Sequence, residues 1–361
     1  MKTSALRTFA ALTLSALALA ACSAPSSAPS SGASGAPAST SQDLRKVNFM
    51  LSWVPDTNHI GVYVARNKGF YAEEGLDVGI LAVAQAGAEQ AVNNGLADFA
   101  LSNMSNIGSL SLQDVHLTQV LQVQQRPSAI WCSLASNAAI TRPKDLDGKV
   151  FATFGANEDS AIVKRMIQGD GGRGEFDSVT VGTSTFHVLQ AGKADFGGFY
   201  STWEGVEAQL KGPKLNCFEG EKYGVPGNPN EIGVITKADT AKKDPAFVKA
   251  FTQATKRGYE YAYAHPDEAG EILVAEAKKD GMEVDPALAK ASMKFIVDGK
   301  FWGDPAKIAD GSFALGTADV AGAQAYYDFL AKAGGTYQDA KGNPVSTAPK
   351  ASELATDQFL K

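Results

Sequence analysis

The sequence predicts an α/β protein built as two lobes. The chain has 361 residues, and the part that follows a low-complexity leader is longer than one ordinary hydrophobic core fills. Apolar stretches of strand type alternate with helical stretches, a pattern that favours largely parallel sheets. A short motif also recurs once, about a hundred residues on, which indicates that the two lobes are built alike.

The first elements follow one another closely along the chain. Residues 47–51 are predicted to form a strand, residues 61–69 a helix closed by a glycine, and residues 76–83 a second apolar strand. The motif GLADF at 95–99 ends a helical stretch and leads into a strand, and GKADF at 192–196 does the same. Chance recurrence of so short a motif is the alternative.

The second half of the chain predicts a new unit and then a return to the first lobe. A turn signal at 142–149 opens the unit, residues 232–236 form a strand, and a helix begins after Asp244 with Pro245 in its first turn. We therefore expect two lobes joined by a hinge that the chain crosses twice. The expected boundaries are 1–22 for a leader, 23–46 for a tether, 47–134 for the first part of lobe one, 135–225 for lobe two, and 226–361 for the return to lobe one and the C-terminal helices.

The leader predicts export and lipid attachment. Lys2 and Arg7 precede a short apolar stretch, and Leu19-Ala20-Ala21-Cys22 resembles a bacterial lipobox, in which the cysteine is lipidated. An ordinary secretory signal with an incidental cysteine is the alternative. The tether is rich in Ser, Ala, Pro and Gly, a composition that is typical of disorder. We expect an extracytoplasmic, lipid-anchored protein on the periplasmic side of a membrane.

Composition and motifs disfavour several classes of function. The net charge of −6 disfavours nucleic acid as a partner, because binding it needs clustered basic residues. The common hydrolase, metalloprotease and nucleotide-binding motifs do not occur, and GDGGRG at 169–174 follows a helix rather than a strand. The four histidines have no metal-ligand spacing. We expect no cofactor, no metal site and no catalytic residues.

The loop after the first strand is the strongest candidate for ligand contact. Ligands in open α/β sheets bind beyond the carboxyl ends of the strands, and this loop also precedes a helix. It carries an aromatic ring, a carboxylate, an amide and an imidazole at Trp53, Asp56, Asn58 and His59. Alternatively, Asp56 caps the helix and Trp53 is a core residue.

A second candidate loop follows the repeated motif in lobe two. Tyr200 and Trp203 offer rings that stack on a flat ligand, and Glu204 offers a carboxylate that accepts N–H bonds from it. Packing of these aromatic rings between the lobes is the alternative. Asn103 and Glu158 are weaker candidates, since either residue could simply cap a helix.

Cys132 and Cys217 lie near the expected lobe crossings. They could form a disulfide across the hinge in an oxidising compartment, or remain two buried thiols.

Several segments together resemble a lipoprotein substrate-binding component of an ABC importer, and more narrowly the family that binds pyrimidine precursors of thiamine. The most specific segment is WVPDTNHIGVYVA at 53–65. The other segments are GFYAEEGL at 69–76, PKDLDGK at 143–149, FYSTWEGVEA at 199–208, RGY at 257–259 and HP at 265–266. The resemblance extends from about residue 48 to about residue 275.

This resemblance implies a type II periplasmic-binding-protein fold that closes over its ligand without chemistry. It implies a small heteroaromatic ligand, hydroxymethylpyrimidine or formylaminopyrimidine, stacked on Trp53, Tyr200 and Trp203 and bonded to Glu204. It also implies ABC permease and ATPase subunits as partners of a monomeric receptor. This sequence departs from the family pattern at Ser102-Asn103, where the pattern has an aromatic residue.

Three alternatives to a pyrimidine-precursor receptor remain open. The ligand could be riboflavin or another flat vitamin-like heterocycle. The protein could instead bind sulfonate or nitrate. An enzyme of the pyrimidine-synthase type shares this fold but carries a cysteine-rich cluster, whereas the cysteines here are far apart.

Overall fold

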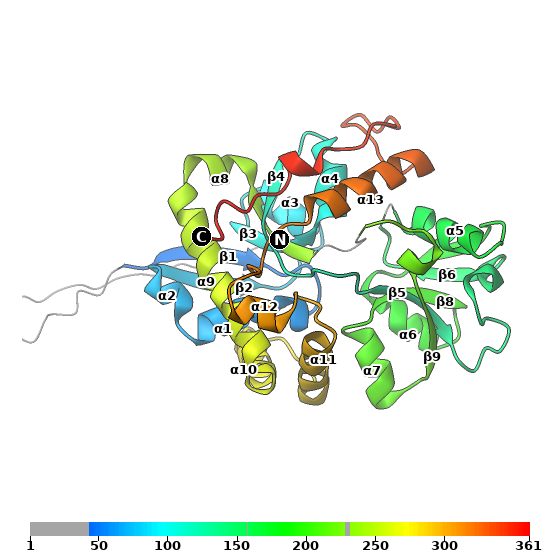
Figure 1. The fold of residues 1–361 in the computed structure, drawn as a ribbon, viewed down its shortest axis with the longest axis horizontal. Coiled ribbons are helices and arrows are strands. Elements are labelled where there is room, and N and C mark those ends of the chain that lie inside the picture. Colours follow the sequence, from blue (N-terminus) through cyan, green and yellow to red (C-terminus); the bar gives the residue numbers. More distant parts are fainter. Residues whose placement is uncertain (1–42, 157, 228–231) are drawn as a thin grey trace, which may run out of the picture. The chain divides into compact units, whose positions relative to one another are not determined.

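Two five-stranded sheets, each with its own helices, form the body of the protein. The computed structural model describes residues 43–156, 158–227 and 232–361. Figure 1 shows the first sheet, with β1–β4, beside the second, with β5, β6, β8 and β9. The expected leader, its Cys22 and residues 23–42 of the expected tether lie outside the described residues.

The first sheet has the strand order β2-β1-β3-β10-β4. Strand β10 is antiparallel to both of its neighbours, whereas β1, β2 and β3 are parallel. The strands are β1 (Arg45–Met50), β2 (Leu76–Leu81), β3 (Phe99–Asn103), β4 (Leu117–Gln122) and β10 (Ile232–Lys237). The helices of this part of the chain are η1 (Thr57–His59), α1 (Ile60–Asn67), α2 (Phe70–Glu73), α3 (Ala88–Asn93), α4 (Met104–Ser111), α8 (Ala238–Lys243), α9 (Pro245–Ala264), α10 (Pro266–Lys279), α11 (Pro286–Asp298) and α12 (Pro305–Ala309).

The second sheet repeats this plan with the order β7-β6-β8-β5-β9, in which β5 is the antiparallel strand. The strands are β5 (Ala129–Leu134), β6 (Val150–Thr153), β7 (Asp177–Thr180), β8 (Phe196–Tyr200) and β9 (Leu215–Glu219). Its helices are η2 (Pro143–Leu146), α5 (Asp159–Gly169), η3 (Gly182–Ser184), α6 (Thr185–Gln190), α7 (Glu204–Lys211) and η4 (Gly220–Tyr223).

The aspartate of the repeated Ala-Asp-Phe motif makes the equivalent hydrogen bond to a neighbouring strand in both lobes. Asp98 precedes β3, and its carboxylate accepts the backbone N–H of Asn48 in β1 at 2.9 Å. Asp195 precedes β8 and accepts the N–H of Val150 in β6, also at 2.9 Å. Each motif thus fixes the register of the strand that follows it, and the predicted similarity of the two lobes is confirmed.

Two of the expected boundaries differ from the structure. Strand β1 begins at Arg45, inside the expected tether, because Arg45 and Lys46 continue the parallel pairing with β2. Strand β5 at 129–134 pairs with β8 and β9, so it belongs to lobe two and not to lobe one. The first crossing therefore lies between β4 and β5, before residue 129.

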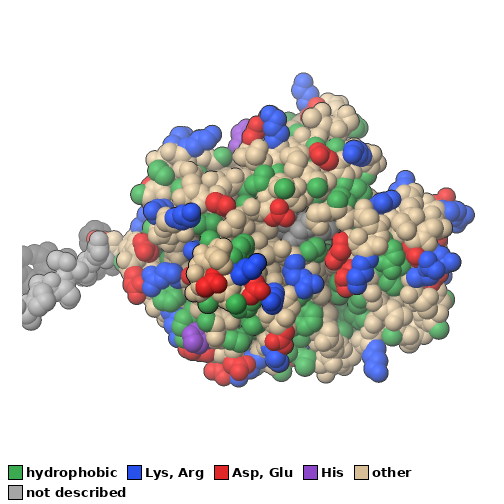
Figure 2. All heavy atoms as spheres, in the orientation of Figure 1, with side chains coloured by type: hydrophobic (Ala, Val, Ile, Leu, Met, Phe, Trp, Pro, Cys, Tyr) green, Lys and Arg blue, Asp and Glu red, His purple; other side chains and the backbone are tan. Residues whose placement is uncertain are grey.

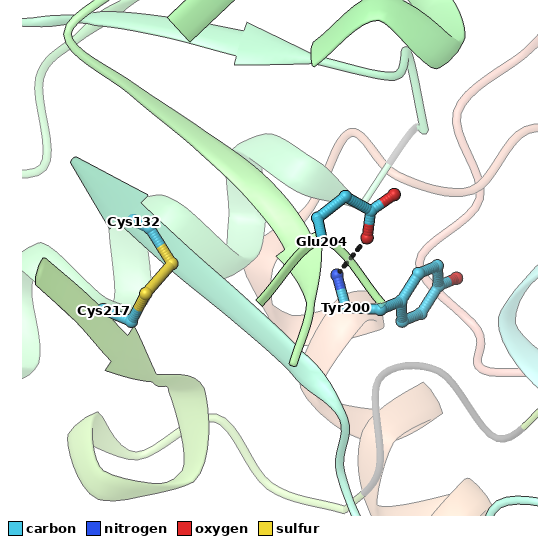
Figure 3. Close-up of a disulfide and its surroundings, with 4 residues drawn as sticks. All are labelled: Cys132, Tyr200, Glu204 and Cys217. Carbon is cyan, nitrogen blue, oxygen red and sulfur yellow. Dashed lines mark hydrogen bonds between the residues drawn. A yellow bond between two sulfur atoms is a disulfide. The ribbon is translucent and has the colours of Figure 1, made fainter. Parts of the chain in front are cut away.

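Cys132 and Cys217 form a disulfide within lobe two. They face each other on the adjacent antiparallel strands β5 and β9, so the bond ties two strands of one sheet together (Figure 3). The expectation that such a bond would span the hinge was wrong, because both strands belong to the same lobe.

Helix α13 (Val320–Ala333) packs against both lobes. Tyr326 and Leu330 join the apolar cluster around Phe151 in lobe two, whereas Ala323 and Tyr327 join a cluster under the first sheet. Figure 1 shows α13 running from lobe one towards α5. The short helix η5 (Ala351–Glu353) follows and packs on α13.

None of the helices in the described ranges combines the length and the apolarity that crossing a bilayer requires. Figure 2 shows basic and acidic side chains interspersed over the visible face.

Candidate ligand-binding site

A cavity of about 550 Å³ lies between the two lobes, and residues of both lobes line it. The loop after β1, the N-terminal turn of α3 and the end of β3 form one wall. The loop between β6 and α5 and the turn between β8 and α7 form the other. These are the strand ends and helix N-termini where α/β proteins bind ligands.

Aromatic rings from both lobes face this cavity. Trp53 of lobe one and Phe154 of lobe two meet across it, with ring centroids 4.7 Å apart. Phe154 is half exposed, so the pair lies where solvent reaches the cavity. The remaining aromatic lining residues come from lobe two, and they are Trp131, Phe151, Phe199 and Tyr200.

The charged side chains that line the cavity are all acidic in the described part of the chain. No lysine, arginine or histidine of those residues contributes to the lining. The acidic residues are Asp56, Glu89, Glu158, Asp159 and Glu204.

Glu204 begins α7 and is the acidic residue nearest in sequence to Tyr200. Its carboxylate accepts the backbone N–H of Tyr200 at 3.1 Å (Figure 3). The side chain is only 8% exposed. Burial raises the pKa of Glu204 to about 7, and the charge of Asp56 adds to the shift.

Glu158 precedes α5 and links the lobes. Its Oε1 accepts the hydroxyl of Ser105 in lobe one at 2.8 Å, and the residue is 5% exposed. Burial raises the pKa of Glu158 to about 7, with a further contribution from Asp159. Burial likewise raises the pKa of Asp159, which accepts the hydroxyl of Thr153.

These carboxylates occupy the helix N-termini that would otherwise attract an anion. Glu204 and Asp159 are the first residues of α7 and α5, and Glu89 lies in the first turn of α3. Free N–H groups at helix N-termini favour negative charge, and here the protein supplies that charge itself. The cavity therefore suits a ligand that donates N–H bonds or carries positive charge.

Asp56 and Asn58 line the cavity but are bonded within the protein. Asp56 caps η1 by accepting the backbone N–H of Asn58 at 2.8 Å, which is the alternative to ligand contact that the sequence analysis named. Asn58 accepts from the side chain of Gln124 at 2.8 Å, which fastens the loop to the first crossing segment. Their side chains shape the wall.

Two of the expected ligand residues lie outside this cavity lining. His59 is fully buried, with Nδ1 2.9 Å from Asp56 Oδ1 and Nε2 facing the backbone N–H of Ser52. Trp203 is 7% exposed and packs against Leu288 of α11. It therefore fills the contact between the lobes, as the packing alternative foresaw.

Asn103 lines the cavity and caps α4 by accepting the N–H of Asn106 at 2.8 Å. The structure thus brings Trp53, Tyr200 and Glu204 to one cavity from distant parts of the sequence, together with Asp56, Asn58, Asn103 and Glu158.

Sequence reasoning missed Phe154, Asp159 and Glu89 among the lining residues. Phe154 and Asp159 flank the loop between β6 and α5, of which the sequence analysis singled out Glu158 alone. Glu89 begins the helix after β2, so the strand-end rule that singled out Trp53 could have found it.

A family model described as NMT1/THI5 like matches residues 56–269, which is more than half of the chain. The chain belongs to the NMT1/THI5-like family. Among curated members, a formylaminopyrimidine-binding protein of Halalkalibacterium halodurans is 27% identical over 266 residues, 72% of this chain and 79% of its own. A 4-amino-5-hydroxymethyl-2-methylpyrimidine phosphate synthase of Legionella pneumophila is 23% identical over 242 residues, 63% of this chain and 72% of its own.

Solved structures share the fold of this family member. The alkanesulfonate-binding protein SsuA of Xanthomonas axonopodis pv. citri, bound to MOPS, superposes with a TM-score of 0.62. The match covers 87% of this chain and 99% of that one at 13% identity. The protein has the type II periplasmic-binding-protein fold.

Proposed function

We propose that this protein is the extracytoplasmic solute-binding receptor of an ABC importer and captures a small, nitrogen-rich heteroaromatic molecule. The leading ligands are pyrimidine precursors of thiamine, either hydroxymethylpyrimidine or formylaminopyrimidine. Cys22 carries the lipid anchor in this proposal, and the permease and ATPase subunits are the partners. The receptor releases its ligand chemically unchanged.

The combination of aromatic rings and buried carboxylates in one cavity carries the proposal. Trp53 and Tyr200 come from different lobes and line the same space as Glu204. A flat ring stacked on such side chains gains roughly 0.5–1.5 kcal/mol per aromatic pair beyond area burial. A carboxylate that accepts N–H bonds from an amino-substituted ring adds a charge-assisted contact, and micromolar binding needs about 8 kcal/mol in all.

The acidic lining favours this ligand class over sulfonate or nitrate. An anion placed beside Glu158 and Glu204 would be repelled by these carboxylates in their ionised form, whereas a ligand that donates N–H bonds would be held by them. The sulfonate-binding relative supports the fold and not the ligand.

The choice of a receptor over an enzyme rests on the predicted export leader and on the relatives. The formylaminopyrimidine-binding relative is more similar to this chain than the synthase relative. Turnover of a pyrimidine precursor by the purified protein would overturn this part of the proposal.

Calorimetric titration tests the proposal, with 4-amino-5-hydroxymethyl-2-methylpyrimidine, its formylaminomethyl relative, riboflavin and an alkanesulfonate as ligands. We expect a pyrimidine to bind, and we expect Glu204→Gln to weaken it by about 10- to 100-fold, the range of a lost charge-assisted bond.

Glu207→Gln is the matched control for Glu204→Gln. Glu207 lies one turn further along α7, outside the cavity lining, and is 3.5 Å from Lys211. This variant should bind like wild type. Equal affinity in all three proteins, or tight binding of the alkanesulfonate, would remove the proposed site.

A further inference from the structure

The cavity carboxylates form two groups. Asp56 and Glu204 come from the loop after β1 and from the start of α7. Glu89, Glu158 and Asp159 come from the starts of α3 and α5. Each group combines both lobes, so closure of the lobes completes both.

Neighbouring residues of α4 hold the second group together, because Ser105 bonds Glu158 at 2.8 Å and Asn106 bonds Glu89 at 2.7 Å. After burial, the neighbouring charges that raise the pKa of Glu158 are those of Asp159 and Glu89. For Glu204 the cavity carboxylate that contributes is Asp56.

Tyr200 lies within reach of both groups. Burial raises the pKa of its phenol, and the charges of Glu204 and Asp56 contribute together with those of Glu158 and Asp159. The ring that is proposed to stack on the ligand lines the same cavity as both groups.

Glu158 is the most buried carboxylate of the second end. One oxygen accepts the Ser105 hydroxyl at 2.8 Å, and the residue is only 5% exposed. A buried carboxylate is costly unless hydrogen-bond donors or a positive charge compensate it. Glu89 beside it accepts from Ser102 and, at 2.7 Å, from Asn106.

A neutral one-ring ligand would satisfy one acidic end only. Its amino edge can meet Glu204, but the three carboxylates of the other end would share one part of the cavity, where no described lining residue supplies a positive charge. A cation at the second end would compensate this negative charge, because opposite charges attract.

We propose that the ligand is two-ended: a flat amino-substituted ring bonded to Glu204, with a cationic substituent such as a protonated primary amine held by Glu89, Glu158 and Asp159. This inference rests on the proposed function and names the charge that the same site selects.

Paired probes that differ in one substituent test it. The first is 4-amino-5-aminomethyl-2-methylpyrimidine, whose side chain is an ammonium ion at pH 7, and the second is the 5-hydroxymethyl compound, which has no ammonium group. Calorimetry on wild type should give at least a 10-fold preference for the aminomethyl probe. Glu158→Gln keeps the acceptor for Ser105 and should reduce that preference to about 3-fold or less by removing charge.

Two further variants make the result specific. Glu204→Gln should weaken both probes and leave their ratio unchanged, whereas Glu175→Gln, an exposed residue of the same lobe, should change nothing. Glu89→Gln repeats the test if the Glu158 variant fails to fold. A wild-type preference below 3-fold, or a preference that survives both Glu158→Gln and Glu89→Gln, would overturn the inference while leaving the proposed function standing. Failure of both probes to bind would overturn both.

Discussion

In the proposed receptor, Glu158 and Glu204 are single residues that give up stability for binding. Each carboxylate is buried where its pKa rises from 4.5 to about 7. The folded protein therefore holds more protons than the unfolded chain between these values, so stability falls as pH rises through that window. A surface position would avoid this cost, but it would not provide a buried acceptor for the proposed ligand.

Neutral side chains at these positions should stabilise the ligand-free protein at high pH. We expect Glu158→Gln and Glu204→Gln each to raise the free energy of unfolding at pH 8 by about 1–3 kcal/mol, since one pKa unit corresponds to about 1.4 kcal/mol. The gain should vanish towards pH 4, where both carboxyls are protonated in either state. Urea denaturation at several pH values measures this, with Glu207→Gln as the unchanged control. Variants that are less stable than wild type at pH 8 would contradict it.

The sequence predicted some of the residues that line the cavity and also named others that do not line it. Trp53 and Glu204 follow strands directly, and strand ends point at the cleft. His59 and Trp203 lie equally close in sequence, but the local turns place them against Asp56 and Leu288 instead. The sequence predicts at which end of the sheet a residue lies, but the conformation of the local turn decides which side chain lines the cavity.

At the scale of elements, α7 and α11 hold the lobes together beside the cavity. Trp203 and Val206 pack on Leu288 of α11. Ser292 of the same helix bonds the Thr57 hydroxyl at 2.6 Å and the carbonyl of Thr202. Lys211 adds an ion pair with Asp285 at 2.6 Å. These contacts join lobe two to lobe one, so they favour closure.

Loss of the Trp203 ring should favour an open arrangement of the lobes. We expect Trp203→Ala to weaken ligand binding by about 10-fold, although the ring does not line the cavity, because the closed population falls and apparent affinity falls with it. Small-angle scattering should show a larger radius of gyration without ligand. Leu288→Ala, on the facing helix, should act in the same direction.

Leu210→Ala is the control for these two variants, since Leu210 lies on α7 and is 49% exposed. It should match wild type in affinity and in size. If Trp203→Ala also matches wild type in both, the α7–α11 contact has no part in closure.

At the scale of the whole molecule, the repeated motif predicted two similar lobes, but the sequence did not predict the boundary between them. Each copy of the Ala-Asp-Phe motif is a contiguous stretch of residues, so the repeat can be recognised in the sequence alone. The crossing before β5 leaves no change of composition, and the membership of β5 depends on pairing with β8 and β9, which are distant in sequence. Helix α13 bridges both lobes through residues outside every recognised segment.

The central claim is that rings and carboxylates from both lobes enclose one nitrogen-rich aromatic ligand. Native mass spectrometry of the protein mixed with equal amounts of the two probe pyrimidines, formylaminopyrimidine, riboflavin, an alkanesulfonate and nitrate tests it most directly. The account predicts one bound pyrimidine per wild-type chain and its loss from Glu204→Gln. A bound sulfonate or nitrate, or equal retention of the same molecule by Glu204→Gln, would contradict it.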